Sequence, residues 1–458
     1  MGEIATRQGE ADAFGKVETH GIEAIQPSER HGKPRELAFL WGGAFVNYAS
    51  LFTASLLTTY YGLGVWDGLA ATAIGTVAAA VMLGLLSNTG PRSGQPQIVF
   101  TRRIFGLRGS YLGAALTLFL AVGWFAVDCV IAAQAGAQLF GGGNRWMTFG
   151  LVLLIAAFSV AVAIYGHQTI KVLETYGAIT FAALSAALFL FLAPSFQWTH
   201  GPTVSGPDYA GAFVLGLMTC FALVASWYPF ASDYSRYLPA SSPSRSVTFW
   251  PVVGVTIPMI LLGLFGLLLP TIDAPLASSQ GVLAVISAHA PAWVAFPFFV
   301  FIVVGEIWAN YLDVYTAGLV TLAMGIKLKR WQTALGCGIL GTALAAYAVL
   351  ISDFHLAYED FLILTYLWAP AWAAVVLLTF FVFEGKGRPS LALAAWIAGT
   401  AASLLFVNYT NLFGNLVAKP SFFNDGLIAN LHGADLSGLI SVGVAAAVYW
   451  FGRRMTTT

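Results

Sequence analysis

Residues 37–61 read LAFLWGGAFVNYASLFTASLLTTYY, an apolar run long enough to cross a bilayer as one helix. The pair Gly42-Gly43 and the amide Asn47 interrupt this run at membrane depth. Non-helical backbone at that depth is tolerated only where it is buried in protein or lines a cavity. The run therefore predicts a broken membrane helix beside an internal cavity, although small residues could also serve close helix packing.

A second interruption lies in residues 209–235, where Ser226-Trp227-Tyr228-Pro229 stands inside another apolar run. Proline removes a backbone donor and crowds the preceding turn, so a helix breaks or bends there. Interrupted segments at corresponding places in two repeats are the best sequence indication of a transporter binding site. The two segments correspond if spans one to five and spans six to ten form an inverted repeat.

The composition of the whole chain excludes a soluble enzyme. Of 458 residues, 58% are hydrophobic and 9% are charged, whereas soluble domains carry about a quarter charged residues. The 21 basic and 21 acidic residues cancel, which gives no basic signature for nucleic acid. The three cysteines lie in apolar stretches without metal-ligand spacing, so we expect neither a metal site nor a cofactor. The composition predicts a multi-pass protein of the cell membrane, with the lipid bilayer as a partner.

The apolar runs also give the expected topology. A spanning helix needs about 20 mostly apolar residues. Such runs lie at 37–61, 66–88, 109–138, 147–165, 170–194, 209–235, 247–270, 292–324, 331–350, 359–383, 390–408 and 436–452. Nineteen of the 21 Lys and Arg residues fall on one side of these twelve spans, and only Arg145 and Lys419 fall on the other. Because basic loops stay in the cytoplasm, both termini are expected there.

This topology divides the chain into four segments. Residues 1–36 are polar and lack the apolar core of a signal peptide, which predicts a cytoplasmic tail. Residues 37–194 and 209–383 hold five spans each and are the expected first and second repeats. Residues 390–458 hold the last two spans and a short cytoplasmic C-terminus.

Three acids remain inside the predicted spans: Asp128, Glu306 and Asp313. An acid in the bilayer costs a few kcal/mol or more, so each is a functional hypothesis, with a structural pair as the alternative. Trp124 and Asp128 are four residues apart and share one helix face. Glu306, Asn310 and Asp313 are spaced four and then three, which places them on one stripe. The two faces could line one cavity, where the ring stacks on a flat ligand and the acids accept hydrogen bonds from N–H groups.

Four motifs now stand in order along the chain. They are SGQPQIV (93–99) with RRIFGLRG (102–109), GWF (123–125), ASDYSRYLP (231–239), and NYLDVYT (310–316). With them the chain resembles the nucleobase–cation symporter-1 family, in its purine–cytosine permease branch. The resemblance implies an all-α LeuT-type fold of two inverted five-helix repeats, with helices one and six broken and two further C-terminal helices. It also implies a site among spans one, three, six and eight for a planar nitrogen heterocycle or ureide.

The resemblance assigns roles to particular residues. Trp124 matches the family's stacking tryptophan, Asn47 matches a polar substrate contact, and Asp128 falls where some members place a substrate-binding amide. In span eight, Asn310 and Asp313 fall in the polar stretch used for substrate. The register of span six stays open among three candidates: Phe221, Ser226 and Trp227.

The cation site of sodium-coupled relatives is degenerate in this chain. The carbonyl positions of that site would be Gly43, Val46 and Gly305. Its two hydroxyl positions read Trp308 and Ala309, which offer no hard oxygen ligand, and an acid, Glu306, stands nearby. We therefore predict coupling to H⁺ rather than sodium, with Glu306 as the first candidate for the protonated group and Asp313 or Asp128 as the second.

The residues together favour a secondary active importer of a nucleobase, related heterocycle or ureide that works by alternating access. A cationic, guanidine-like or vitamin-precursor substrate is the alternative, since three acids exceed what a neutral nucleobase requires; sodium coupling is another. A membrane-embedded enzyme or a channel would be a different class. The seven histidines lie in the tail, in loops or at span ends, so no histidine metal cluster or catalytic dyad is expected in the membrane interior. The sequence leaves the oligomeric state open.

Overall fold

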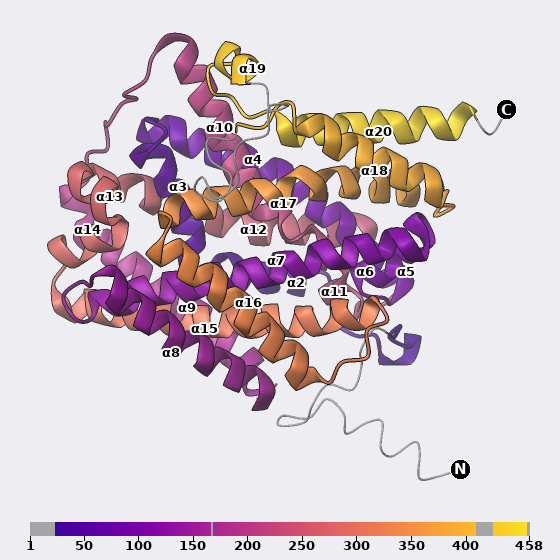
Figure 1. The fold of residues 1–458 in the computed structure, drawn as a ribbon, viewed down its shortest axis with the longest axis horizontal. Coiled ribbons are helices and arrows are strands. Elements are labelled where there is room, and N and C mark those ends of the chain that lie inside the picture. Colours follow the sequence, from indigo (N-terminus) through magenta and orange to yellow (C-terminus); the bar gives the residue numbers. More distant parts are fainter. Residues whose placement is uncertain (1–22, 166–167, 409–424, 456–458) are drawn as a thin grey trace.

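The computed structural model describes residues 23–165, 168–408 and 425–455, and this part of the chain is helical without strands (Figure 1). Its α-helices are α2 (Glu36–Phe45), α3 (Tyr48–Thr59), α4 (Val65–Ser87), α5 (Thr89–Ser93), α6 (Gln97–Phe100), α7 (Arg102–Gln138), α8 (Arg145–Tyr165), α9 (Gln168–Leu192), α10 (Gly206–Ala225), α11 (Ala231–Ser235), α12 (Ser244–Leu268), α13 (Ala274–Gln280), α14 (Val282–His289), α15 (Ala292–Ala323), α16 (Arg330–Leu350), α17 (Phe354–Leu377), α18 (Pro389–Ser403), α19 (Asp425–Asn430) and α20 (Ser437–Met455). Short turns of other helix types lie at Pro27–Glu29, Ala193–Ser195, Tyr228–Phe230, Leu269–Thr271 and Leu378–Val382.

The membrane character of these helices follows from their length and hydropathy. Within the described residues, eight helical segments are long and apolar enough to cross a membrane, and the bent pair of α2 and α3 makes a ninth. Helices α8, α18 and α20 occupy the runs expected at 147–165, 390–408 and 436–452 but are not among these nine. The protein is therefore a multi-pass membrane protein, and the count of twelve spans stays a prediction. Most of the predicted cytoplasmic tail, residues 1–22, lies outside the described residues.

The run at 37–61 forms two helices, α2 and α3, bent by 58° at a short break. Asn47 stands in the break with an extended backbone and caps α3, because its side-chain oxygen accepts the Ser50 N–H at 3.0 Å. Its Nδ2 donates to the carbonyl oxygen of Ala44 in α2 at 2.8 Å. One amide thus satisfies a backbone donor of one helix and a backbone acceptor of the other, which explains its presence at membrane depth.

The interruption at Pro229 is milder than the first. Helix α10 ends at Ala225, a 3₁₀ turn covers Tyr228–Phe230, and α11 begins at Ala231. Gly206–Ser235 nevertheless counts as one spanning segment. Pro229 lies at the start of the 3₁₀ turn, where its missing N–H removes no α-helical hydrogen bond. The segment therefore changes helix type without a sharp bend.

Helix packing brings the acid-bearing segments together. Helices α7 and α15, both labelled in Figure 1, pack against each other along much of their length. This packing sets Asp128 near Asp313 and Glu306 of α15. Helix α12 packs against α2, α3 and α4, while α10 packs against α4. The molecule thus has an α7–α15 pair beside a group formed by α2, α3, α4, α10 and α12, and the two breaks belong to that group.

Candidate functional site

A small cavity, here called the central cavity, lies among the breaks and the α7–α15 pair. Its volume is about 50 Å³. The α2–α3 break, α7, the segment from α10 to α11, and α15 form its wall. The lining residues are Ala44, Phe45, Asn47, Ser50, Trp124, Asp128, Leu223, Trp227, Phe230, Tyr234, Ala309, Leu312, Asp313 and Thr316. These segments are spans one, three, six and eight of the expected topology.

Five of the predicted substrate residues line this cavity: Asn47, Trp124, Asp128, Trp227 and Asp313. They come from all four segments and are separated by up to 266 positions in the sequence, so only the fold brings them together. The side chain of Asn47 is occupied by its hydrogen bonds across the break. It therefore shapes the wall of the cavity as well as facing it.

The remaining three substrate candidates lie outside the lining: Phe221, Ser226 and Asn310. The buried Ser226 hydroxyl donates to the carbonyl oxygen of Leu223 at 2.7 Å. Asn310 is fully buried, and its Nδ2 donates to Cys129 Sγ at 3.3 Å and to Ser159 Oγ at 3.2 Å. Asn310 therefore ties α15 to α7 and α8 from behind the cavity.

The three intramembrane acids lie close together and are here called the carboxyl chain. The charge of Asp128 interacts with both Asp313 and Glu306. Asp128 and Asp313 line the central cavity, whereas Glu306 does not and is 4% exposed. A buried acid that ionises is costly unless a positive partner compensates it.

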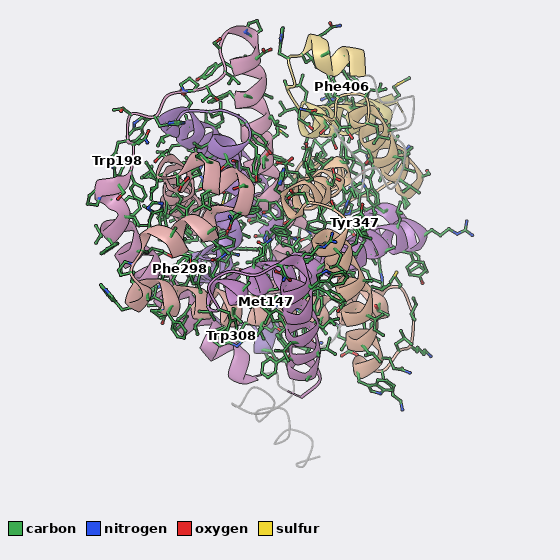
Figure 2. The ribbon with its side chains drawn as sticks, turned by 60° about the vertical axis from the view of Figure 1, so that its left-hand side comes forward. Met147, Trp198, Phe298, Trp308, Tyr347 and Phe406 are labelled. Atoms are coloured by element: carbon green, nitrogen blue, oxygen red, sulfur yellow. The ribbon has the colours of Figure 1, made fainter. Side chains whose placement is uncertain are left out.

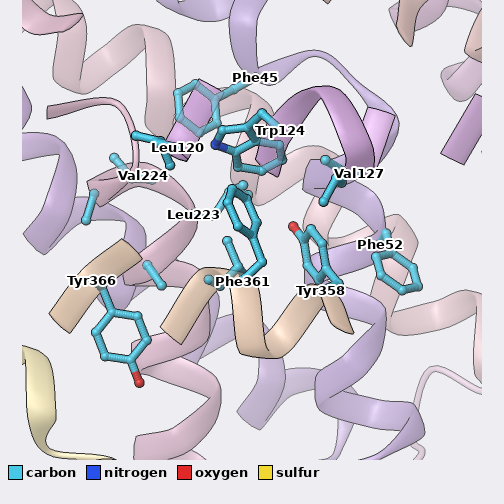
Figure 3. Close-up of a cluster of buried hydrophobic side chains, with 14 of the residues drawn as sticks. Phe45, Phe52, Leu120, Trp124, Val127, Leu223, Val224, Tyr358, Phe361 and Tyr366 are labelled. Carbon is cyan, nitrogen blue, oxygen red and sulfur yellow. The ribbon is translucent and has the colours of Figure 1, made fainter. Parts of the chain in front are cut away.

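The Trp124 ring is held in place by aromatic residues of α17. It meets Phe361 edge-on with ring centroids 5.3 Å apart and Tyr358 edge-on at 6.3 Å (Figure 3). A Cβ atom at Gly123 would approach the Phe361 ring to 2.1 Å, so only glycine leaves room for that ring. The sequence GWF thus combines a ring that lines the cavity with the glycine that lets its support come close.

Two aromatic residues that follow Pro229 were not predicted from the sequence. Phe230 and Tyr234 line the central cavity together with the predicted Trp227. Trp227 packs against Phe45 at 6.1 Å and against Phe230 at 5.9 Å between ring centroids. The spacing of three and then four residues was a signal for one face, but the proline hid it because helical spacing is not expected through a break.

Thr316 was also missed, and it lines the cavity three residues after Asp313. It continues the stripe that begins at Glu306, since three- and four-residue steps stay on one helix face. Extending that stripe by one more step would have found it.

The two side-chain positions of the predicted degenerate sodium site, Trp308 and Ala309, carry apolar groups. The Trp308 ring lies against α9, where a Cβ at Gly177 would come within 2.5 Å of the indole (Figure 2). Gly43 faces the same helix, because a Cβ there would lie 3.9 Å from the Ala178 methyl group. Ala309 presents a methyl group to the central cavity. Among the described residues, no group of three His, Cys, Asp or Glu side chains is placed to hold a metal ion.

The motif at 231–239 places Tyr234 on the wall of the central cavity, and its neighbours Ser232 and Asp233 contact the motif at 93–99 outside that wall. The Gln97 N–H donates to Asp233 Oδ1 at 2.7 Å, and the Ser232 N–H donates to Gln97 Oε1 at 3.1 Å. The Ser232 hydroxyl donates to the Gln95 carbonyl oxygen at 3.0 Å. These bonds fasten the end of span six to the loop that follows α5, so this pair of motifs has a structural role there.

A second cavity, here called the α17 cavity, has a volume of about 210 Å³. It is lined by Tyr60, Tyr61, Leu215, Thr219, His355, Leu356, Glu359, Asp360, Leu362, Ile363, Tyr366 and Asn408. The Tyr61 hydroxyl donates to Glu359 Oε1 at 3.1 Å, and the Tyr60 ring stacks on His355 at 4.1 Å. Beside it, His355 Nδ1 lies 2.7 Å from Asp353 Oδ1, and this hydrogen bond lowers the pKa of Asp353.

Comparison with known proteins bears on the family of the chain. Residues 24–390 match the model of the family described as permease for cytosine/purines, uracil, thiamine, allantoin. YxlA of Bacillus subtilis, which carries a purine-cytosine permease name, is 27% identical over 95% of each chain. The vitamin B6 transporter TPN1 of Saccharomyces cerevisiae is 24% identical over 72% of this chain and 59% of its own length.

Solved structures agree on the fold. Mhp1, a nucleobase-cation-symport-1 family transporter solved in a closed conformation with bromovinylhydantoin bound, is 15% identical with a TM-score of 0.73 over 95% of each chain. A manganese transporter of Eremococcus coleocola shares 13% identity and a TM-score of 0.58 over 90% of this chain and 92% of its own. The family resemblance drawn from the motifs is thereby confirmed. The chain belongs to the nucleobase–cation symporter-1 family of permeases, and it is a membrane transporter and not an enzyme.

Proposed function

We propose that the protein imports a nucleobase, or a related small nitrogen heterocycle or ureide, by alternating access coupled to H⁺. The observation that carries this proposal is the central cavity, in which an aromatic ring and two carboxyl groups face the same space between two interrupted spans. Twelve spans, two inverted repeats at 37–194 and 209–383, and cytoplasmic termini in the inner or plasma membrane complete the proposed architecture.

The lining offers what a flat heterocycle needs. Its ring would stack on Trp124, since offset stacking of aromatic rings is favourable beyond the area it buries. Its N–H groups would donate to the carboxyl oxygens of Asp128 and Asp313, which are acceptors when ionised. Trp227 and Phe45 would close the opposite side. Asn310 would act by holding α15 against α7 and α8, whereas the Ser226 hydroxyl is used on the carbonyl oxygen of Leu223 in its own segment.

Proton coupling is supported by the carboxyl chain and by the filled sodium positions. Glu306 lies close to Asp128 but does not line the cavity, so it would hold a proton without touching the substrate. The packing of Trp308 against α9 leaves a ring where sodium-coupled relatives place a hydroxyl. Sodium needs hard oxygen ligands, which an indole and a methyl group lack.

A second substrate candidate is a vitamin or vitamin precursor. The matched family includes thiamine in its description, and one relative is named a vitamin B6 transporter. Both are aromatic nitrogen heterocycles, so the same stacking ring and carboxyl groups would serve them. We place this class second because the relative that covers 95% of each chain carries a purine-cytosine name.

Uptake by the purified full-length protein in liposomes tests the proposal. Labelled cytosine, uracil, allantoin, thiamine and pyridoxine are offered separately under an inward proton gradient and under an inward sodium gradient. We expect saturable accumulation of at least one of them with the proton gradient alone. Accumulation that requires sodium and ignores the proton gradient contradicts the coupling, and the absence of accumulation for all five contradicts the substrate class.

A further inference from the structure

We propose that the central cavity binds its substrate as a cation, in the form of a planar nitrogen compound with a delocalised positive charge. Amidinium groups, protonated aminopyrimidines and pyridinium rings belong to this class. The inference rests on the proposed function because it concerns the same cavity, and it narrows the substrate to one charge state.

The first support is the charge of the lining. Asp128 and Asp313 are its charged residues, and no Lys, Arg or His stands among the lining residues. Oppositely charged groups at contact distance in a poorly solvated site attract far more strongly than in water. The wall therefore favours a positive ligand over a neutral one of the same shape.

The second support is the cost of an ionised acid that has no partner. Asp128 lines the cavity and is 4% exposed, so its carboxylate would have little contact with water. A neutral ligand that expelled water from the cavity would leave such a charge without a partner, which is costly. A cation would neutralise it.

The third support is the state of the neutral polar groups at the α2–α3 break. Asn47 donates one amide N–H to the Ala44 carbonyl oxygen and accepts from the Ser50 N–H, and the Ser50 hydroxyl donates to the Phe45 carbonyl oxygen at 2.7 Å. The break therefore offers the ring carbonyls of a neutral nucleobase only the second N–H of the Asn47 amide. A cation with N–H groups needs acceptors instead, and the carboxyl groups supply them.

The fourth support is the aromatic share of the wall. Five rings line the cavity: Phe45, Trp124, Trp227, Phe230 and Tyr234. The negative face of an aromatic ring attracts a cation, most strongly where water is excluded. Rings and carboxyl groups together form the kind of surface that recognises flat organic cations.

The arrangement separates the substrate from the coupled proton. The cation would pair with Asp313 and Asp128 at the cavity, while Glu306 would keep its proton behind Asp128. Substrate and proton then bind together instead of competing for one carboxyl group, as symport requires.

Binding of benzamidine and benzamide to the purified protein tests the inference. The two have nearly the same shape, but benzamidine is an amidinium cation at pH 7 and benzamide is neutral. Binding is measured by calorimetry in detergent. Benzamidine is expected to bind at least about tenfold more tightly than benzamide, because benzamide leaves the lining acids without a positive partner. Equal or tighter binding of benzamide, or no binding of benzamidine at millimolar concentration, overturns the inference.

Substitutions locate the effect. Asp313→Asn should remove most of the preference for benzamidine, whereas Asp353→Asn, the same exchange beside the α17 cavity, should preserve it. A preference that survives in Asp313→Asn overturns the assignment to this cavity; if that variant does not fold, Asp128→Asn takes its place with the same expectation.

Failure of this inference is distinguishable from failure of the proposed function. Proton-driven uptake of a neutral nucleobase together with tighter benzamide binding refutes only the charge state, and tight benzamidine binding without any uptake refutes only the transport proposal.

Discussion

The central cavity and the α17 cavity both contain acids, but the acids have different partners. In the α17 cavity Glu359 accepts a hydrogen bond from Tyr61, and the nearby Asp353 is paired with His355. In the central cavity the charge of Asp128 interacts with two other acids, Asp313 and Glu306. Acids that neighbouring donors satisfy contribute to structure, whereas acids grouped with one another are suited to exchange a proton or to meet a cation. Four substitutions test this contrast.

The largest effect is expected for Asp128→Ala. It removes a carboxyl group that lines the central cavity and accepts N–H groups in the proposed binding mode. Losing a hydrogen bond to a charged group costs up to about 3 kcal/mol, so uptake into liposomes should fall by roughly 100-fold. Glu359→Ala in the α17 cavity is the control and should stay within about threefold of the unchanged protein. Equal losses for the two variants would erase the contrast.

Trp124→Ala should have the next largest effect. Stacking of a heterocycle on an aromatic ring contributes about 1–3 kcal/mol, so substrate binding should weaken by about 10- to 100-fold. Trp124→Phe should recover most of this loss because a ring remains. Tyr60→Phe, which keeps a ring stacked on His355, serves as the control at the α17 cavity. Calorimetry with the transported compound gives the readout, and unchanged binding in Trp124→Ala would exclude the stacking role.

Glu306→Gln should affect coupling more than binding. The amide keeps the size of the side chain but cannot exchange a proton, so accumulation driven by a pH gradient should fall about tenfold. Substrate affinity should change less than about threefold, because Glu306 does not line the central cavity. Uptake is measured with and without the gradient. If gradient-driven accumulation is intact, Glu306 is not the coupling residue.

Asp353→Asn should have the smallest effect. Its hydrogen bond with His355 lowers the pKa of Asp353, so the pair stabilises the protein above the usual pKa of 3.8 and loses that effect as the pH falls through the folded-state pKa. The Asp353 side chain is 63% exposed, which limits the contribution to about 0–1 kcal/mol. Thermal unfolding in detergent should show a small difference between variant and unchanged protein at pH 7 that shrinks below pH 4. A difference that grows on acidification would contradict this sign.

The main elements of the site could be predicted from the sequence, because acids buried in the membrane and interrupted spans are rare and cost free energy. Asp128 and Asp313 were therefore visible as candidates before any fold was known, and the family motifs were specific enough to identify the permease family. Asn310 lies on the same stripe as Asp313, yet it points toward Cys129 and Ser159. Periodicity defines a helix face, but it does not say which neighbouring helix covers each part of that face.

The two helix interruptions, at Asn47 and Pro229, show a similar limit of prediction from the sequence. Both interruptions were recognisable from Asn47 and Pro229, but only the first produces a bend of 58°. Proline at the start of a 3₁₀ turn lets span six continue, which no single-residue rule distinguishes from a sharp break. That continuation also sets Phe230 and Tyr234 on the cavity wall, so the missed residues and the milder break have one cause.

The side chain of Asn47 has a mechanical consequence for span one. Its two hydrogen bonds connect the two helices at the break. One is donated to the Ala44 carbonyl oxygen of α2, and the other is accepted from the Ser50 N–H of α3. Swinging α2 relative to α3 requires release of one of these bonds, at a net cost of about 0.5–1.5 kcal/mol. The other bond can persist while the angle between α2 and α3 changes. The bend between α2 and α3 is therefore held by a few hydrogen bonds, whose net cost of release is small compared with the free energy of binding a ligand.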